Sequence, residues 1–325
     1  MPPTKPKIDR SSGEFRPLGP PVKEDHVGLR ADGYLSTHFP FYSRATWQKR
    51  MRNGLVIVDG RPIKASYRLS EGQIIQIYHP QVAEPDVDRD IYPLWKQGSV
   101  MAVYKPGNLP MHENGPYRKN TFAYFVKQDL GDQWAAVHRL DRETSGIVLC
   151  GSSLEVRHEL SRSLADRVLE KEYLAIARGE PKKDAWVESG PIADLDSSEI
   201  RIKKWVLPHG LPSETHFKVL DTKGEYVLLR ARPKTGRTNQ IRIHAAYNGL
   251  PLVGDMLYHP DEDVFLEWFE HGRKTDRVIE QIGFRRCLLH AASLTFLHPE
   301  TNQEVTVRCP MPEDMQKFWD TLPKN

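Results

Sequence analysis

From residue 99 to the end of the chain, short apolar runs of strand length alternate with stretches of helical periodicity. The runs are VMAVYKP, GIVLCG, EYLAIAR and EYVLLRARP. Runs of this length, rich in β-branched residues, are typical of strands, and strands interleaved with helices indicate a mixed domain. We therefore predict one large α+β domain over residues 99–325.

A smaller and more basic module is predicted over residues 28–78. There SRATWQKRMRNG predicts a helix ended by Gly54, VIVDGRPI predicts a β-hairpin around Asp59-Gly60, and EGQIIQIY predicts an alternating strand. The module carries eight basic and three acidic side chains, although the whole chain has a net charge of only +3. This concentration of positive charge favours contact with a polyanion.

Two segments lack the pattern of a packed core. Residues 1–27 contain six prolines and mixed charges, so they cannot bury enough apolar surface to offset the loss of conformational entropy. We expect a flexible N-terminal arm, which is either inert or in contact with nucleic acid. Residues 79–98 contain Pro80, Pro85 and Pro93 among acidic side chains, and we expect them to form a linker between the two domains.

The sequence shows no sign of a membrane anchor or a metal site. Its start, MPPTKPKIDRSSGEF, has no apolar segment of the kind that a secretory signal needs, and no eighteen apolar residues run together. Cys150, Cys287 and Cys309 are far apart and form no CxxC pair, which argues against a disulfide framework and a zinc site. We expect a cytoplasmic protein with no metal and no membrane partner.

The densest cluster of polar side chains is HRLDRETSG, which runs directly into the apolar segment IVLC. Asp141 at its centre presents a carboxylate at the start of a predicted strand. An ionised carboxylate can act as a nucleophile or stabilise positive charge where water is excluded. Taken alone, the cluster also fits a charged turn in which Asp141 caps a neighbouring amide.

Two later segments contain further candidate residues. In KEY, Lys171 and Tyr173 point to the same face, because side chains alternate along a strand. PKTGRTNQIRIH predicts a glycine turn into a helix with Thr238 as the N-cap, which places Arg237 at a helix start suited to anion contact. A core tyrosine beside an exposed lysine, and a solvated arginine at a turn, are the structural alternatives.

In this order and at about this spacing, HRLDRETSG, KEY and TGRTNQIRIH resemble the motifs of the RluA-type pseudouridine synthases. The basic module resembles the small RNA-binding domain shared with ribosomal protein S four, through SRATWQKRMRNGLVIVDG and LSEGQIIQI. The first resemblance covers roughly residues 99–310. It extends to Lys105-Pro106, Leu109-Pro110, Gly254-Asp255 with Tyr258, Leu289-His290-Ala291 and His298-Pro299.

The resemblance implies a pseudouridine synthase fold, in which helices and loops flank a mixed, largely antiparallel central sheet. A small α/β RNA-binding domain would precede it. The implied activity is an isomerase that converts specific uridines of structured RNA to pseudouridine, with ribosomal RNA favoured and transfer RNA possible. The reaction has no redox step, so no cofactor is expected, and we expect a monomer.

The resemblance also assigns roles to residues. Asp141 is the implied nucleophile, and Tyr173 would stack on the flipped base and is a candidate for taking the C5 proton. Arg237 is expected beside Asp141, where a guanidinium favours the ionised carboxylate. Arg139 would fill the place of the extruded nucleotide, and Lys171 would orient the tyrosine or hold a phosphate. The expected backbone contacts of the basic module are Arg44, Lys49, Arg50 and Arg52.

The chain departs from the family pattern at Asn239, where the third motif usually has His. A helix-like stretch at residues 259–286 also looks variable, and it either shapes substrate choice or packs as an extra amphipathic helix. Two other function classes are alternatives. A non-catalytic RNA-binding or assembly factor is motivated by Asn239 and the basic module, whereas the intact Asp141 argues against it. A metal-dependent nuclease lacks clustered carboxylates.

Overall fold

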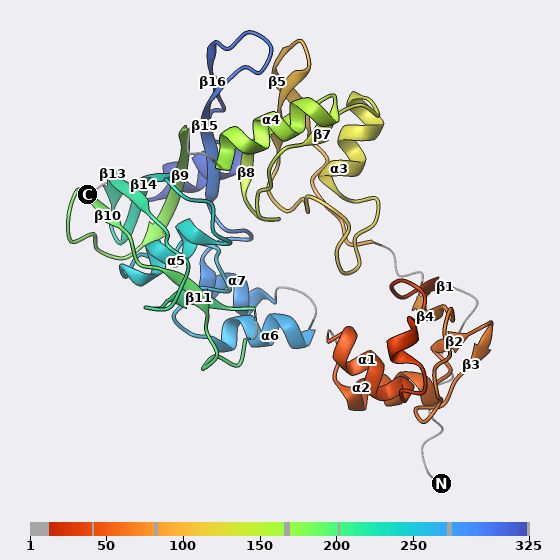
Figure 1. The fold of residues 1–325 in the computed structure, drawn as a ribbon. Coiled ribbons are helices and arrows are strands. Elements are labelled where there is room, and N and C mark those ends of the chain that lie inside the picture. The colour runs from red at the N-terminus through yellow and green to blue at the C-terminus, as the bar shows by residue number, and fades with distance from the viewer. Residues whose placement is uncertain are drawn as a thin grey trace. The chain divides into compact units, whose positions relative to one another are not determined.

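The computed structural model describes residues 13–40, 42–80, 84–165, 170–200, 202–271 and 275–323. The chain divides into two compact units, Met1–Ala83 and Glu84–Asn325, which we call the front unit and the second unit. Each unit has its own sheet and its own helices (Figure 1).

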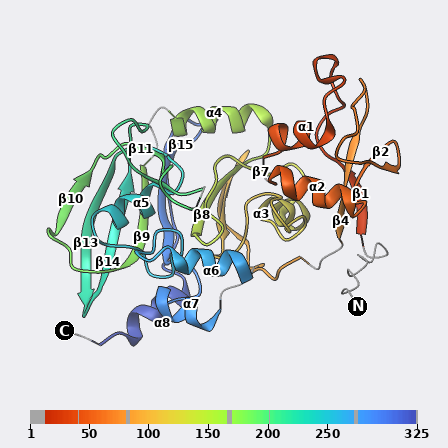
Figure 2. The ribbon, with the colours of Figure 1, turned by 90° about the horizontal axis from the view of Figure 1, so that it is seen from below.

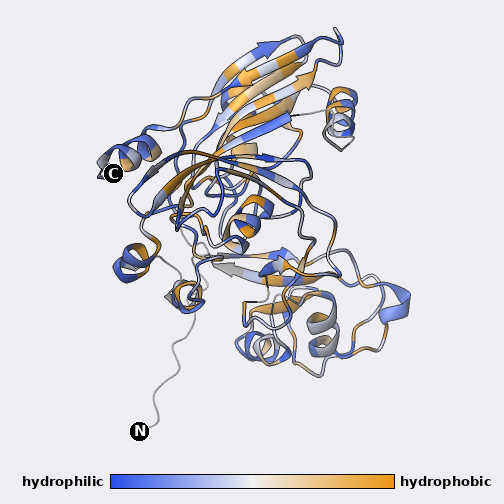
Figure 3. Cartoon of the chain, turned by 90° about the vertical axis from the view of Figure 1, so that its left-hand side faces the viewer, coloured by the Kyte–Doolittle hydropathy of each residue, from blue (hydrophilic) through white to orange (hydrophobic). Residues whose placement is uncertain are grey.

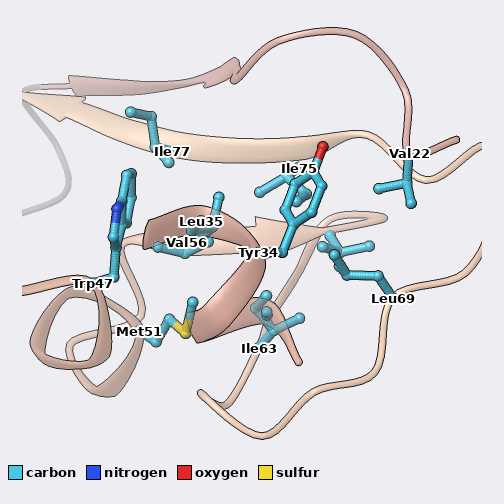
Figure 4. Packing of buried hydrophobic residues seen from close by; sticks show 12 residues of the cluster. Val22, Tyr34, Leu35, Trp47, Met51, Val56, Ile63, Leu69, Ile75 and Ile77 are labelled. Carbon is cyan, nitrogen blue, oxygen red and sulfur yellow. The ribbon is translucent and has the colours of Figure 1, made fainter. Parts of the chain in front are cut away.

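The front unit is a small antiparallel sheet with two helices. The strand order is β1 (Gly13–Pro17), β4 (Ile75–Pro80), β2 (Val56–Val58) and β3 (Arg61–Pro62). A short 3-10 helix, η1 (Glu24–His26), precedes α1 (Ala31–His38) and α2 (Arg44–Arg52). Figure 4 shows Leu35 and Trp47 of the helices packed with Val56 and Ile77 of the sheet in one hydrophobic core.

The local elements predicted for the front unit are confirmed. Ser43 caps α2 by accepting a hydrogen bond from the Thr46 amide, and the chain leaves the helix at Gly54, whose φ is +67°. Asp59 and Gly60 both have positive φ angles, +50° and +73°, as a two-residue hairpin between β2 and β3 requires.

In two segments the structure differs from the sequence-based expectation. Part of the expected flexible arm, residues 13–17, forms β1 and pairs with β4, and Val22 is buried. Part of the expected linker, residues 92–97, forms β5 in the sheet of the second unit. Pairing with a neighbouring strand supplies backbone hydrogen bonds that composition does not reveal. Residues 1–12 and 81–83 lie outside the described residues.

The second unit is built on a ten-stranded mixed sheet. The path runs β10-β13-β14-β9-β15-β8-β6-β5, with β16 beside β15 and β7 beside β8. In the described chain only β15 and β8 pair in parallel, which confirms the expected mixed and largely antiparallel sheet. The strands are β5 (Tyr92–Gln97), β6 (Val100–Lys105), β7 (Ala135–Ala136), β8 (Ser145–Gly151), β9 (Glu170–Arg178), β10 (Ala185–Glu188), β13 (Thr215–Lys223), β14 (Tyr226–Pro233), β15 (Leu289–Leu297) and β16 (Glu304–Arg308).

Helices cover the centre of this sheet. β6 and β8 are buried at every position, as expected for strands with both faces covered. Phe122 and Phe125 of α3 belong to one hydrophobic cluster on these strands, and Leu160 of α4 belongs to another. Figure 3 shows hydrophobic residues concentrated along the strands. The remaining elements are α3 (Phe122–Phe125), the π-helical η2 (Val126–Leu130), α4 (Leu154–Ala165), β11 (Ile192–Asp194), β12 (Lys204–Val206), α5 (Gln240–Tyr247), α6 (Asp263–His271), α7 (Asp276–Ile282) and α8 (Glu313–Thr321).

The parallel contact between β8 and β15 depends on a glycine. Gly146 has a φ of +118°, and a Cβ at this position would lie 2.3 Å from the Ala291 carbonyl oxygen. Only glycine allows this close approach without strain. The approach fixes where β8 begins, and therefore where the polar loop before it is held. Among the described helices, none has the length and apolar character needed to cross a membrane.

Candidate active site

The three predicted motifs meet around one cleft of the second unit, with a volume of about 300 Å³. Asp141 comes from the loop before β8, Tyr173 from β9, and Arg237 from the turn between β14 and α5. Because β9 and β8 both pair with β15, segments far apart in sequence become neighbours. The lining also includes His138, Arg139, Leu140, Thr144, Lys171, Thr238, Asn239, Gln240, Ile241, Arg242 and Leu289. We call this space the main cleft.

The carboxylate of Asp141 is accessible from the main cleft and has a cationic partner. Its side chain is 30% exposed, and its Oδ2 accepts a hydrogen bond from Nη1 of Arg242 at 3.2 Å. An exposed fraction of this size leaves room for a substrate atom to approach. The observed contact with a guanidinium fits the nucleophile interpretation better than that of a capping turn.

The loop that carries Asp141 is held through its backbone. Leu109 donates its amide to the Arg142 carbonyl at 3.0 Å, and the Lys105 ammonium donates to the same carbonyl at 3.1 Å and to the Pro106 carbonyl at 2.7 Å. Lys105 is completely buried, and burial lowers its pKa to about 7. These bonds position the loop rigidly, as a preorganised site requires.

Arg242 of α5 is fixed by several partners at once. Its Nε and Nη2 donate to the two oxygens of Asp255 at 2.6 and 2.7 Å, and its Nη1 also donates to Asn239 at 2.9 Å. Its guanidinium lies 5.1 Å from the centre of the Tyr258 ring. Burial opposes the charge of Arg242, but the carboxylates of Asp255 and Asp141 raise its pKa above the usual range. The bidentate pair with Asp255 therefore sets the orientation in which Arg242 meets Asp141.

Arg237 is not the partner of Asp141, contrary to the sequence-based expectation. Its side chain is exposed, and its Nε donates to the Pro212 carbonyl at 3.0 Å. The helix begins later than predicted, because Asn239 rather than Thr238 occupies the N-cap position, with a left-handed φ of +58°. Arg237 therefore lies in the turn before α5, whereas Arg242 lies within the helix and reaches Asp141.

Lys171 and Tyr173 line the same cleft, as the strand alternation predicts. Burial raises the pKa of Tyr173 above the usual range, and the Asp141 charge adds to this effect. Burial lowers the pKa of Lys171. At neutral pH the cleft therefore presents an uncharged phenol on the wall next to the carboxylate.

Two residues that precede Asp141 in its motif differ in their surroundings. Arg139 is exposed at the edge of the main cleft. His138 accepts a hydrogen bond from the Leu149 amide at 3.1 Å, and burial lowers its pKa to about 3. His138 thus anchors the loop to β8 as a neutral ring, while Arg139 is the side chain that is available to a ligand.

The candidate RNA contacts of the front unit also differ among themselves. Lys49 and Arg52 are exposed. Arg50 donates to the Tyr78 carbonyl at 2.9 Å and lies 5.0 Å from the centre of the Tyr42 ring. Arg44 pairs with Asp32 at 3.1 Å but is still more than half exposed. Arg50 is therefore largely engaged within the unit.

Sequence reasoning missed Arg242 and Asp255 as site residues, although both lie in segments that resemble the family. Two signals could have identified them. Arg242 is the second arginine of TGRTNQIRIH. It lies inside the predicted helix, where the helical repeat sets the direction of the side chain. Asp255 is an acidic residue in an otherwise apolar stretch, LVGDML, where a buried charge needs a cation. In the described ranges, no group of three or more His, Cys, Asp or Glu side chains is arranged to hold a metal ion.

Comparisons with known proteins identify relatives of this chain among pseudouridine synthases. A family model described as RNA pseudouridylate synthase matches residues 99–247. Ribosomal large subunit pseudouridine synthase C of Vibrio vulnificus is 28% identical over 316 residues, covering 93% of this chain and 95% of that protein. The uncharacterized RNA pseudouridine synthase YlyB of Bacillus subtilis is 29% identical over 318 residues, covering 94% and 97%. The structure of human RNA Pseudouridylate Synthase Domain Containing 1 has a TM-score of 0.55 at 20% identity, covering 74% of this chain and 99% of that one.

Proposed function

Since the chain belongs to the RluA-type family of RNA pseudouridine synthases, we propose that it isomerises uridines of ribosomal RNA with Asp141 as nucleophile. Proteins called ribosomal large subunit pseudouridine synthases C and D are among its relatives, which supports ribosomal RNA as the substrate. Transfer RNA is the alternative that a test on both RNAs would reveal.

The observation that carries the proposal is the pairing of an accessible carboxylate with a fixed guanidinium. Asp141 lines the main cleft, and Nη1 of Arg242 lies 3.2 Å from its Oδ2. The other side of the same guanidinium pairs with Asp255. A nearby positive charge favours the ionised form of a carboxyl group, and only the ionised form is nucleophilic. Once RNA covers the cleft and excludes water, this attraction becomes stronger.

The reaction rearranges bonds within one nucleotide and consumes no other reagent. The C–N bond between uracil and ribose breaks, the base turns, and a bond forms between C5 and C1′ of the ribose. C5 loses its proton and N1 takes one up, so that the product is an isomer of the uridine. In our proposal Asp141 attacks the uridine or stabilises its charge while the C–N bond breaks. The cleft keeps the detached uracil close to the sugar until the C–C bond forms.

Tyr173 suits a stacking role. Its ring lines the cleft beside Asp141, where a flipped uracil would lie against it. Because burial raises the pKa of Tyr173, its phenol keeps its proton at neutral pH, and little of the basic phenolate form is present to take the C5 proton. We therefore assign Tyr173 to base stacking and hydrogen bonding rather than to the proton transfer.

RNA has to be held and locally unstacked, which costs ~ a few kcal/mol. Exposed Arg139 at the edge of the cleft is our candidate for occupying the vacated position, and Lys171 for holding a phosphate. We propose that the front unit binds RNA as domains of the ribosomal protein S four type do, through exposed cations such as Lys49 and Arg52. We further propose that the protein acts as a monomer in the cytoplasm.

The test is the Asp141→Asn variant, which retains the shape of the side chain and removes its charge. We expect it to bind RNA labelled with tritium at uracil C5 and to release no tritium. Asp196→Asn is the matched control, because Asp196 is an exposed aspartate outside the main cleft. Release by Asp141→Asn at the rate of the control would show that the nucleophile is another group. No release by the unmodified enzyme would favour a non-catalytic RNA-binding protein.

A further inference from the structure

A second, smaller cavity adjoins the catalytic ion pair. It has a volume of about 160 Å³ and shares Asp141, Thr144 and Arg242 with the main cleft. A water molecule in the liquid takes up about 30 Å³, so this volume corresponds to several water molecules. The cavity therefore has room for a planar ring. Its remaining lining residues are Arg142, Glu143, Met256, Leu257, Phe265, Trp268 and Cys287. We call it the α6 cavity.

Two of the lining side chains come from the stretch at residues 259–286, which the sequence analysis expects to be variable. Phe265 and Trp268 are three residues apart on α6 and therefore lie on one face of the helix. The same helix packs against α7 (Figure 2), where Val264 and Phe265 share a hydrophobic cluster with Val278. The sequence leaves two interpretations of this stretch open, packing or substrate choice. In the structure one face of α6 packs against α7 and also borders the catalytic ion pair.

The chemistry of the α6 cavity suits a nucleobase. Trp268 is only partly buried, so part of its ring can be covered by another ring, and Met256 and Leu257 add apolar surface. Arg142 lies at the same cavity with 31% of its side chain exposed, and its guanidinium pairs with Glu143 of the same lining at 3.2 Å. An aromatic ring beside a guanidinium is the arrangement by which proteins bind unpaired bases and their phosphates.

We propose that the α6 cavity binds an unpaired nucleobase adjacent in the RNA strand to the target uridine, and that Trp268 stacks on it. This inference rests on the proposed function. The two cavities meet at the Asp141–Arg242 pair, so consecutive nucleotides of one strand can occupy them. Extrusion of the target uridine also removes one stacking partner of its neighbour, which Trp268 would replace. The stretch at residues 259–286 then contributes to the choice of uridine.

The test compares Trp268→Ala with the unmodified enzyme on two RNA stem-loops. Both carry a tritium-labelled uridine at a position mapped by comparing ribosomal RNA from deletion and parent strains. In the second stem-loop an abasic nucleotide replaces one neighbour of that uridine, and each neighbour is replaced in turn. Stacking of a base on an aromatic side chain contributes about 1–3 kcal/mol, so we expect Trp268→Ala to raise KM by about fivefold or more.

The abasic RNA separates base binding from a purely structural effect. If Trp268 stacks on the neighbouring base, one abasic position raises KM of the unmodified enzyme, and Trp268→Ala adds nothing further on that RNA. Trp268→Phe should restore most of the affinity. Leu266→Ala is the matched control, because Leu266 packs against the hydrophobic cluster of Val264, Phe265 and Val278 without lining the cavity. We expect it to lower thermal stability without changing KM.

Two results would overturn the inference. An unchanged KM for Trp268→Ala on intact RNA would exclude stacking, and an equal loss on intact and abasic RNA would assign Trp268 to folding alone. Neither result would contradict the proposed isomerase activity, which fails if the unmodified enzyme releases no tritium. In that case the inference falls with it.

Discussion

Arg242 joins two carboxylates of opposite exposure: its Nη1 lies 3.2 Å from Oδ2 of Asp141, which faces the cleft, and its Nε lies 2.6 Å from Oδ2 of the buried Asp255. The buried carboxylate holds the guanidinium and the accessible one receives its charge. One cation thus links the stability of the second unit to the surroundings of Asp141, the proposed nucleophile.

Replacing Arg242 should therefore impair both properties. Arg242→Gln leaves Asp255 buried without its cation, and breaking such a pair costs about 3–5 kcal/mol of unfolding free energy. We expect the double variant Arg242→Gln with Asp255→Asn to recover much of this stability, measured by urea unfolding. Its rate of tritium release should stay about 100-fold or more below that of the unmodified enzyme, because the charge beside Asp141 is gone.

Arg237→Gln is the comparison for that experiment. Arg237 is exposed and lies outside the ion pair, so Arg237→Gln should change the unfolding free energy of the protein by less than about 0.5 kcal/mol. A stability loss as large as that of Arg242→Gln would contradict the assignment of the buried pair.

Tyr173→Phe should retain RNA affinity, since the variant keeps the aromatic ring that we propose stacks on the flipped base. Tyr173→Leu should weaken RNA binding by about fivefold or more, because base stacking contributes about 1–3 kcal/mol. We also expect Tyr173→Phe to release tritium at a measurable rate, because the raised pKa keeps the phenol protonated and leaves little of the basic phenolate. Loss of release to the level of Asp141→Asn would instead assign the C5 proton to the hydroxyl. Filter binding and tritium release measure the two quantities.

The buried His290 should make the fold sensitive to acid. Its ring bonds to Ser145 and to the Cys309 carbonyl, and burial lowers its pKa to about 4. An unfolded histidine has a pKa of about 6.5, so between these values the unfolded state binds more protons. The stabilising effect is present above pH 6.5 and is lost as the pH falls toward 4.

We expect His290→Gln to reduce the slope of unfolding free energy against pH by up to about 1.4 kcal/mol per pH unit between pH 6 and 5. His209→Gln, at an exposed histidine, should leave the slope unchanged. Urea unfolding at a series of pH values measures both slopes. Equal slopes for the unmodified protein and His290→Gln would show that this ring does not resist protonation.

Charge removal in the front unit should separate RNA-binding cations from structural ones. Each phosphate that the protein no longer binds should reduce the dependence of log affinity on log salt by about 0.7 on single-stranded RNA. We expect this change for Lys49→Gln and Arg52→Gln, with normal thermal stability. Arg50→Gln should lower the stability of the front unit instead, because it removes the bond to the Tyr78 carbonyl. A salt dependence unchanged in all three variants would contradict RNA binding by this unit.

Local patterns in the chain were enough to predict the class of fold and to bring Asp141 and Tyr173 to one cleft. Strand-length apolar runs predicted the α+β sheet, and alternation along β9 correctly placed Lys171 and Tyr173 on the lining of one cleft. These features are local, because the direction of a side chain within a strand and the chemistry of a short motif depend on neighbours in the chain.

Three results come from packing and from no local pattern: Arg242 meets Asp141, residues 13–17 and 92–97 are strands, and α6 lines the cavity beside the ion pair. Each of these results joins segments that are far apart in sequence. Whether Arg237 or Arg242 reaches the carboxylate depends on where α5 begins and on Asp255, which lies beyond that helix. A local sequence pattern reveals neither the exact start of α5 nor the position of Asp255 in space. Packing therefore selects the arginine that meets Asp141.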